Sequence, residues 1–309
     1  MKLLVYHFGY RGDILVVGQN FTRELKARFP DAEIGLMLRP RMSETFDFLR
    51  PLGLWREIRL GEKHDYAVAQ RDYDRAYMID ERVYPEGNLR TVFTKAGLPF
   101  RLHPLTLVTT KEDDDIAARI ATRRGRPLIA TQADMARKWD ENKVRELWGR
   151  LEEVGTLLVV GPDCVQPAVG RALTFRESAA LVRHADLFVG IDSGISHAAA
   201  LVGTQTVLIP PVFPESWISP TEYANPFIME ESRKHVSIRP PPELFCGHYF
   251  CLHPTRDGGI RRHCGDPRRV RCNWRKRFGF LTKSCCFLQI SVDAVFDAVA
   301  TVLKRRRLL

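Results

Sequence analysis

Short apolar runs alternate with amphipathic stretches along the first half of the chain. The apolar runs lie at residues 3–6, 34–38 and 76–79. Between the first two, residues 14–29 have the pattern of a helix that ends at Pro30. Strands that alternate with helices are typical of a mainly parallel sheet, so we expect an α/β domain here.

The same alternation returns after a charged, turn-rich tract at residues 111–126, which we expect to contain a helix. Residues 127–131 predict the first strand of a second series, and further buried strands are predicted at residues 157–160, 187–190 and 206–209. A helix between the first two strands is predicted by apolar residues spaced i, i+3, i+4 and i+7: Val144, Leu147, Trp148 and Leu151. We therefore expect two domains, residues 1–125 and residues 126–309.

The end of the second domain has two distinct segments. Residues 243–286 form an excursion rich in cysteine and arginine. Residues 291–304 predict a final helix that Ser291 can cap. Its apolar stripe consists of Val292, Val295, Phe296, Val299, Val302 and Leu303. Such a stripe needs a large apolar partner surface.

Composition and charge narrow the class of protein. The 309 residues are 45% hydrophobic and 27% charged, which suits packed domains with their own cores. No window approaches the roughly 20 apolar residues that span a bilayer, and the start lacks a cleavable signal, so we expect a cytoplasmic protein. The net charge of +10 favours anionic partners such as a nucleotide or a glycolipid. The basic run at residues 304–307 fits contact with the inner face of the membrane.

The turn after the first strand is the first candidate for chemistry. It carries Gly9, Gly12 and Asp13 and does not match the GxGxxG dinucleotide fingerprint. Asp13 is either a plain helix cap or a general base at the carboxyl end of a parallel strand, where open α/β sheets bind ligands.

Two further turns carry polar residues at predicted helix starts. Thr131, Arg137 and Lys138 could cradle a diphosphate by charge and backbone amides, or form a solvated basic turn. A buried strand also delivers Asp192, Ser193 and Gly194 onto the start of a helix rich in small residues, with His197 in its first turn. That geometry is an anion site. Asp192 alone could be an N-cap and His197 alone a core histidine, but their combination favours a site.

Together these turns resemble the lipopolysaccharide heptosyltransferase family. The matching features are a Gly-Asp pair near residue 13, a basic turn with Trp139, and an Asp-Ser-Gly-x-x-His turn before an alanine-rich helix. The resemblance runs in order along nearly the whole chain. It departs at residues 209–213, which lack the usual Gly-Pro-Thr.

The resemblance implies a GT-B fold, in which two Rossmann-like domains face a central cleft. The first domain would bind the acceptor and the second the nucleotide sugar, with the final helix packing back towards the first domain. It further implies an inverting, metal-independent transfer from a nucleotide-diphosphate sugar such as ADP-heptose to an anionic glycan or glycolipid. No cofactor would be required for catalysis.

The resemblance also implies roles for individual residues. Asp13 would be the base that deprotonates the acceptor, and Arg11 would contact that acceptor. The expected donor-binding residues are Gly12, Thr131, Arg137, Lys138, Asp192, Ser193, Gly194 and His197.

Alternatives stay open beside this interpretation, two for metal sites and two for function. Six of the seven cysteines lie between residues 246 and 286, and Cys246, Cys251, Cys264 and Cys272 could hold a structural zinc or iron, or be buried thiols. The run at residues 113–115 resembles a metal-binding DxD clamp, but acids at a helix start explain it more simply. For function, the alternatives are a basic, cysteine-rich nucleic-acid-binding protein and a sugar-nucleotide epimerase of the same fold.

Overall fold

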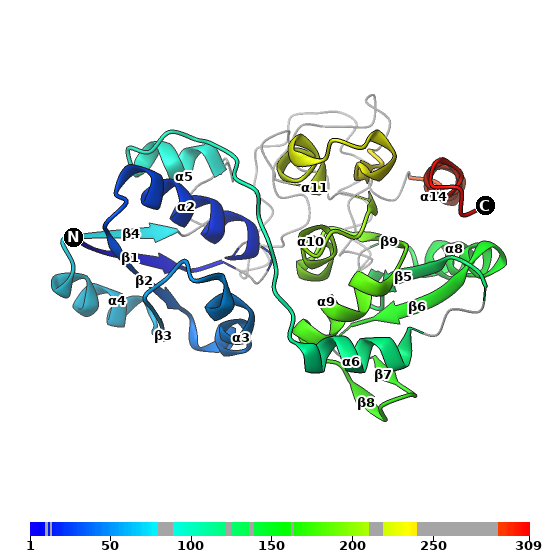
Figure 1. Cartoon of the computed structure of the whole chain (residues 1–309), viewed down its shortest axis with the longest axis horizontal. Helices are drawn as coiled ribbons and strands as arrows, with labels where there is room; N and C mark the ends of the chain where they lie inside the picture. The colour runs from blue at the N-terminus through cyan, green and yellow to red at the C-terminus, as the bar shows by residue number, and fades with distance from the viewer. Residues whose placement is uncertain are drawn as a thin grey trace, which may run out of the picture.

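The protein was analysed as a computed structural model. It describes residues 1–9, 12, 14–79, 89–121, 125–135, 139–161, 164–209, 219–239 and 290–309. Two parallel sheets, each covered by helices, account for most of these residues (Figure 1).

The first sheet has the strand order β3-β2-β1-β4, and all of its neighbours are parallel. Its strands are β1 (Lys2–His7), β2 (Glu33–Leu38), β3 (Glu57–Leu60) and β4 (Arg75–Ile79). The three strands predicted from apolar runs are β1, β2 and β4. The pattern missed β3, an edge strand whose residues are all partly exposed.

The connections of the first half are helical. The helix predicted at residues 14–29 begins as a π-helical turn at Ile14–Gly18 and continues as α2 (Gln19–Arg28). The other helices are α3 (Phe46–Leu49), α4 (Lys63–Ala69) and α5 (Leu89–Lys95), with 3₁₀ turns at Pro40–Thr45, Arg50–Leu52 and Gln70–Asp72. π-helical turns frequently mark functional sites.

The second sheet has the order β11-β10-β9-β5-β6 and is also parallel. Its strands are β5 (Leu128–Gln132), β6 (Thr156–Val160), β9 (Leu187–Ile191), β10 (Thr206–Ile209) and β11 (Val236–Ser237). A small antiparallel hairpin joins β7 (Val165–Gln166) to β8 (Arg171–Ala172). The helices are α6 (Lys111–Ile120), α8 (Glu141–Val154), α9 (Phe175–His184), α10 (Gly194–Leu201), α11 (Pro220–Tyr223) and α14 (Val292–Arg305), with 3₁₀ turns at Asn225–Phe227 and Glu231–Arg233.

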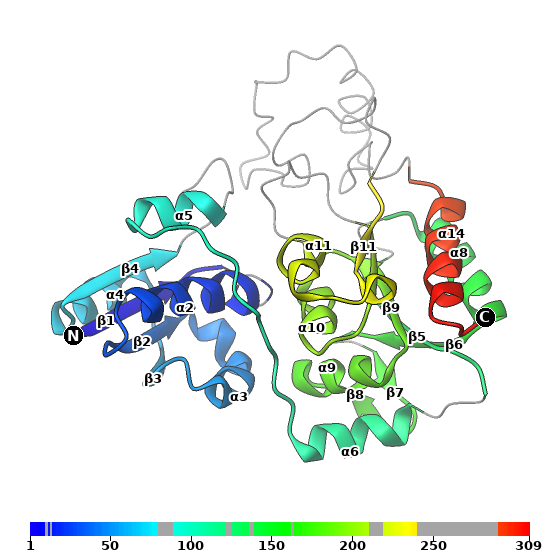
Figure 2. The same ribbon diagram turned by 45° about the horizontal axis from the view of Figure 1, so that its top comes forward.

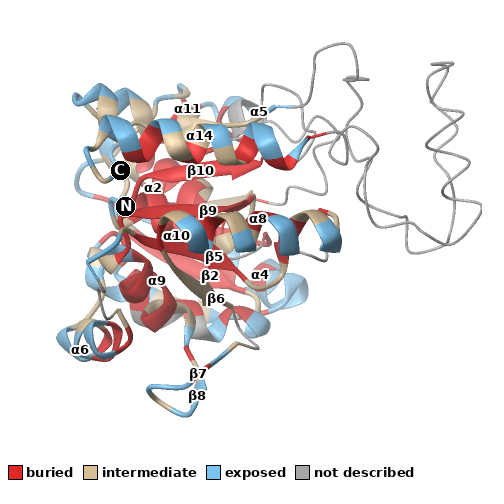
Figure 3. Cartoon of the chain, turned by 90° about the vertical axis from the view of Figure 1, so that its right-hand side faces the viewer, coloured by how far each residue is buried: buried red, intermediate tan, exposed pale blue. Residues whose placement is uncertain are grey.

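The strands β5, β9 and β10 are buried (Figure 3). Their alternate residues supply a separate core on each face of the second sheet. In β9, Leu187, Val189 and Ile191 pack with α8 and α14. Phe188 points to the opposite face and packs with α6, α9 and α10. Helices on both faces fix the carboxyl edge of this sheet, where the strands end in the candidate turns.

The final helix α14 has the predicted stripe and cap, but a different partner. Ser291 Oγ accepts a hydrogen bond from the N–H of Ala294 at 3.1 Å. The stripe packs against α8 and β10, and Figures 1 and 2 show α14 beside α8. The described contacts of this helix lie within the second half, whereas the resemblance implied that it packs back towards the first domain. Its partner surface on α8 consists of the buried Val144, Leu147 and Leu151, and Arg150 of α8 pairs with Asp293 at 2.6 Å.

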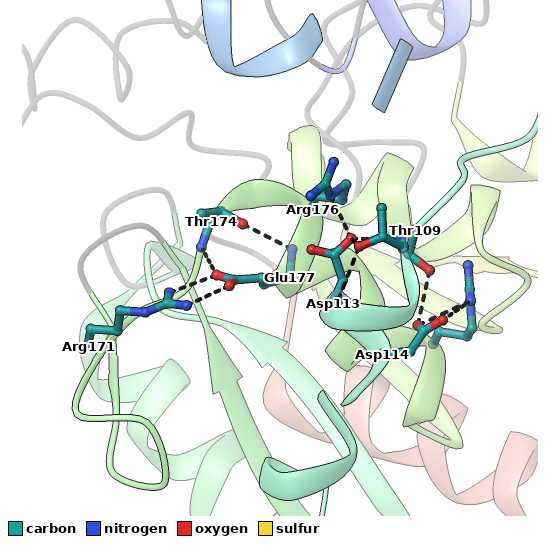
Figure 4. A network of polar contacts seen from close by, with 9 residues as sticks. Thr109, Asp113, Asp114, Arg171, Thr174, Arg176 and Glu177 are labelled. Carbon is teal, nitrogen blue, oxygen red and sulfur yellow. Dashed lines mark hydrogen bonds and ion pairs between the residues drawn. The ribbon is translucent and has the colours of Figure 1, made fainter. Parts of the chain in front are cut away.

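The helix α6 packs on the second half, against α9, through a network of charges (Figure 4). Asp113 caps α6 with Thr110 and pairs with Arg176 of α9 at 2.6 Å. Asp114 pairs with Arg183 of α9 at 3.2 Å. Asp115 pairs with Lys111 at 2.6 Å. Each of the three acids at residues 113–115 thus has a structural partner.

The segment before α6 is held by the first half. Gln19 of α2 donates to the carbonyl of Thr106 at 3.0 Å. His103 donates its N–H to Asn20 at 2.9 Å, and its ring lies 3.1 Å from the buried carboxylate of Glu24. The chain therefore passes from the first half to the second between Thr106 and Thr110.

Apolar contacts also join the two halves. The core around β1 and β2 continues into Ala198 and Leu201 of α10 and into Tyr223 of α11. The rings of Phe48 and Phe175, one from each half, have centroids 5.3 Å apart. Helix α10 faces the first half in Figure 1 and contacts its π-helical turn at Ile14–Gly18.

Candidate functional site

The turn between β9 and α10 is built as an anion site. Ser193 is the N-cap of α10: its Oγ accepts the N–H of Ser196 at 3.3 Å, and its own N–H donates to Ser196 Oγ at 2.9 Å. Within the described chain, the N–H groups of Gly194 and Ile195 have no hydrogen-bond acceptor. Both residues are partly exposed. Free amides at the positive end of a helix dipole attract phosphate or carboxylate oxygens.

The side chain of Gln132 ties this turn to the end of β5. Its Oε1 accepts the N–H of Ile191 at 3.2 Å and the hydroxyl of Ser193 at 3.1 Å. Its Nε2 donates to Asp134 at 2.7 Å. Gln132 is only 1% exposed, so this amide links two adjacent turns from inside the protein. The turns after β5 and β9 are therefore fixed relative to each other.

Gly190 makes room for that link. A Cβ at this position would lie 2.6 Å from Gln132 Oε1 and 2.7 Å from the ring of Phe188. Contacts this short displace one of the partners. Glycine is thus required at position 190 because the side chain of Gln132 approaches the strand so closely.

His197 lies between Asp192 and Tyr223. Its Nε2 is 3.1 Å from Asp192 Oδ1, and its Nδ1 is 3.1 Å from the hydroxyl of Tyr223. Burial raises the pKa of Tyr223 well above its usual value, and the charge of Asp192 raises it further. Tyr223 therefore keeps its proton and can donate it to Nδ1, which leaves the ring proton on Nε2, the side that faces Asp192. The imidazole holds the Asp192 carboxylate at its own side of the turn.

The first half meets this turn at Gly12. A Cβ on Gly12 would lie 2.8 Å from Cδ2 of His197 and 3.5 Å from Cα of Gly194. On the other side of the same turn, His7 Nδ1 accepts the N–H of Gly9 at 3.1 Å, and His7 is fully buried. The turn after β1 and the turn after β9 thus come together, as expected for residues that follow parallel strands.

The structure brings together five of the residues predicted from the sequence: Gly12, Asp192, Ser193, Gly194 and His197. Thr131 is fully buried, and its hydroxyl points to Met135 Sδ at 3.8 Å rather than to the turn. Several predicted residues lie outside the described part of the chain: Arg11, Asp13, Arg137, Lys138, Cys246, Cys251, Cys264 and Cys272. The arginine-rich part of the excursion lies there too. Trp139 is fully buried in the core beside α8.

The described residues contain neither a metal-binding cluster nor a membrane-spanning helix. Among them, no group of three or more His, Cys, Asp or Glu side chains is arranged to hold a metal ion. No described helix is both long and apolar enough to cross a membrane.

Comparison with known families decides the class of protein. Residues 110–209, from the cap of α6 to the end of β10, match the family model described as glycosyltransferase family 9 (heptosyltransferase). This region of the chain is similar to the family 9 glycosyltransferases. The predicted resemblance to heptosyltransferases and the prediction of a glycosyltransferase are confirmed. The matched region contains the Gln132 amide and the whole turn before α10.

Solved structures confirm the GT-B fold. A family 9 glycosyl transferase from Veillonella parvula DSM 2008 is 13% identical, with a TM-score of 0.62 over 98% of this chain and 97% of that one. The ADP-heptose lps heptosyltransferase II of E. coli is 16% identical, with a TM-score of 0.58 over 99% and 100%. The iron-containing dodecameric glycosyltransferase TibC of enterotoxigenic E. coli H10407 is 16% identical, with a TM-score of 0.59 over 100% and 77%. No curated protein matches the chain.

Sequence reasoning missed two residues of the site. Gln132 follows Thr131, and the strand alternation could have shown that their side chains point to opposite faces. Tyr223 lies 26 residues beyond His197 in the chain, so no local pattern connects the two.

Proposed function

We propose that the protein is an inverting glycosyltransferase that needs no metal for catalysis. It transfers heptose or a similar sugar from a nucleotide-diphosphate donor to an anionic glycan or glycolipid. The observation that carries the proposal is the turn before α10, where the free amides of Gly194 and Ile195 stand at a helix start beside a paired Asp192 carboxylate.

The donor side of the proposal rests on the second half. The leaving diphosphate carries negative charge, which helix amides and cations stabilise without a metal. In this proposal Gly194 and Ile195 bind the diphosphate, and Arg137 and Lys138 complete the pocket. Neighbours of the same fold support this type of donor, because one is named as an ADP-heptose heptosyltransferase and another is in complex with ADP-D-beta-D-heptose. The donor base and sugar for this chain are part of the proposal.

The acceptor side of the proposal rests on the turn after β1. Asp13 follows Gly12, which contacts His197 and Gly194. These two residues belong to the turn between β9 and α10, which we call the donor turn. Asp13 is therefore our proposed general base, and Arg11 our proposed acceptor contact. In this proposal the acceptor-binding first half and the donor-binding second half are two separate domains. The contacts of α6 favour a boundary just before Thr110, ahead of the expected residue 125.

The reaction balances with these groups alone. The Asp13 carboxylate takes the proton of the acceptor hydroxyl, and the freed oxygen attacks the anomeric carbon of the donor sugar. The bond from that carbon to the diphosphate oxygen breaks, and the nucleoside diphosphate leaves with the electron pair. Attack opposite the leaving group inverts the configuration. Positioning and charge stabilisation by the two turns supply the catalysis.

A structural metal in the excursion is a separate proposal. Cys246, Cys251, Cys264 and Cys272 supply thiolates suited to zinc or iron. TibC, a neighbour of the same fold, is named as iron-containing. Metal analysis of the purified protein should find about one equivalent that is lost in a Cys246→Ser/Cys251→Ser variant. A metal-free wild type would remove this proposal and leave the transferase proposal untouched.

The proposed function is tested by the release of nucleoside diphosphate. A thermal-shift screen of nucleotide sugars first identifies the donor. Release is then measured with and without heptose-free lipopolysaccharide as the acceptor. A transferase releases the diphosphate only when acceptor is present. An epimerase converts the sugar without release. A protein that binds single-stranded RNA with a steep salt dependence, and turns over no sugar nucleotide, would contradict the proposal.

A further inference from the structure

We propose that His197 is a positioning residue that sets the first-half turn on the donor turn, and that Tyr223 fixes its ring for this task. The inference rests on the proposed function, because it concerns the alignment of the two turns that carry it. It assigns a role to the buried hydroxyl of Tyr223, which neither binds donor nor contacts acceptor in the proposed mechanism.

The ring of His197 is fixed on both nitrogens. Tyr223 forms a hydrogen bond with Nδ1, and Asp192 Oδ1 lies at an ion-pair distance from Nε2, each at 3.1 Å. The rings of His197 and Tyr223 lie 5.7 Å apart at a tilt of 34°. The side chain of His197 is 7% exposed and Tyr223 is 1% exposed. A buried imidazole with a partner at each nitrogen has one favoured orientation. It therefore presents a fixed edge, the Cδ2 edge, to the first half.

Gly12 rests against that edge. The Cβ that Gly12 lacks would come within 2.8 Å of Cδ2 and 3.5 Å of Nε2 of His197. Gly12 is buried, and no other residue type allows its backbone to approach the ring as closely. The π-helical turn that follows, Ile14–Gly18, contacts α10 as well. The orientation of the His197 ring thus determines the position of the turn after β1.

The anchor of Tyr223 extends this arrangement to a third element. Tyr223 ends α11, and Ser219 and Glu222 cap that helix reciprocally. The N–H of Tyr223 donates to the carbonyl of Ser219 at 3.2 Å. Helix α11 thereby fixes the hydroxyl, the hydroxyl fixes the imidazole, and the imidazole sets Gly12 relative to Gly194. A proposed base that follows Gly12 in the chain depends on this alignment.

Two substitutions test the inference on the full-length chain. Tyr223→Phe removes only the hydroxyl and should lower kcat about tenfold, while the Kd for ADP changes by less than about twofold. Gly12→Ala pushes on the ring and should lower kcat by about 10²-fold, the cost of a misplacement near 1 Å. The matched control is Tyr66→Phe, a buried tyrosine of helix α4 in the first half, which should leave both constants unchanged.

A spectroscopic measurement separates this inference from the proposed function. In ¹⁵N-histidine spectra, wild-type His197 should show a protonated Nε2 and an acceptor Nδ1. Tyr223→Phe should mix the two tautomers, and Gly12→Ala should shift both resonances. An unchanged His197 pattern in both variants overturns the inference, as does a loss of ADP affinity and melting temperature in proportion to kcat. If the wild type transfers no sugar at all, the proposed function fails, and the ¹⁵N spectra still decide the inference about the ring.

Discussion

The turn after β9 and the turn after β1 lie against each other but are held in different ways. The second-half turn is fixed by side chains of its own half: Gln132 binds it from β5, Ser193 caps it, and Tyr223 anchors His197. On the described side of the first-half turn, His7 holds Gly9, and Gly12 rests on a ring that belongs to the other half.

This difference shows which part of the site is preformed. The donor turn has its hydrogen bonds in place without the first half, so it should bind a diphosphate without rearrangement. The first-half turn depends on the docking of the two halves, which meet through α10 and the Phe48–Phe175 contact. Binding of donor and activation of acceptor should therefore respond to different substitutions.

The largest expected effect separates the two turns by chemistry. Asp13→Asn should lower the rate of transfer by about 10²-fold or more, because general-base catalysis typically contributes roughly 10² to 10⁴. ADP affinity, measured by titration calorimetry, should stay near that of the wild type. Asp31→Asn, a change at an exposed aspartate of the same half, serves as the control. A near wild-type rate in Asp13→Asn would remove this residue from the mechanism.

An intermediate effect is expected from the amide that fixes the donor turn. Gln132→Leu leaves Ile191 N–H, Ser193 and Asp134 without their partner and should weaken ADP binding about tenfold, which corresponds to roughly 1.4 kcal/mol. Gln166→Leu is the matched control, since Gln166 is also buried but bonds to the carbonyl of Val159 away from the turn. Equal ADP affinity in the two variants would show that the donor turn keeps its shape without Gln132.

The smallest effect on the site is expected from the charges that hold α6. Arg176→Met leaves the buried carboxylate of Asp113 without its cation and should cost about 1–3 kcal/mol of unfolding free energy in urea. Arg183→Met removes a half-exposed pair with Asp114 and should cost less than about 1 kcal/mol. ADP affinity should be unchanged in both. A loss of ADP binding in Arg176→Met would mean that the scaffold and the donor turn are not separable.

The sequence predicted the elements that are buried and periodic. The strands β1, β2, β4, β5, β6, β9 and β10 follow from apolar runs, and α8 and α14 from their stripes. The sequence did not predict β3, because this edge strand is exposed and shows no hydrophobic periodicity. Glu57 and Arg59 of β3 pair at 2.6 Å on that edge. The site followed the same rule. Local turns such as Asp192-Ser193-Gly194 were visible in the sequence, whereas the partner of His197 and that of α14 depend on tertiary packing.

The central claim is that the amides before α10 bind the diphosphate of the donor. Backbone amide NMR of the labelled protein, titrated with ADP, tests it most directly. The account predicts that the N–H resonances of Gly194 and Ile195 move furthest downfield, as expected for amides that gain a phosphate acceptor, while Gly9 moves little. Saturable ADP binding that leaves Gly194 and Ile195 unmoved would contradict the account.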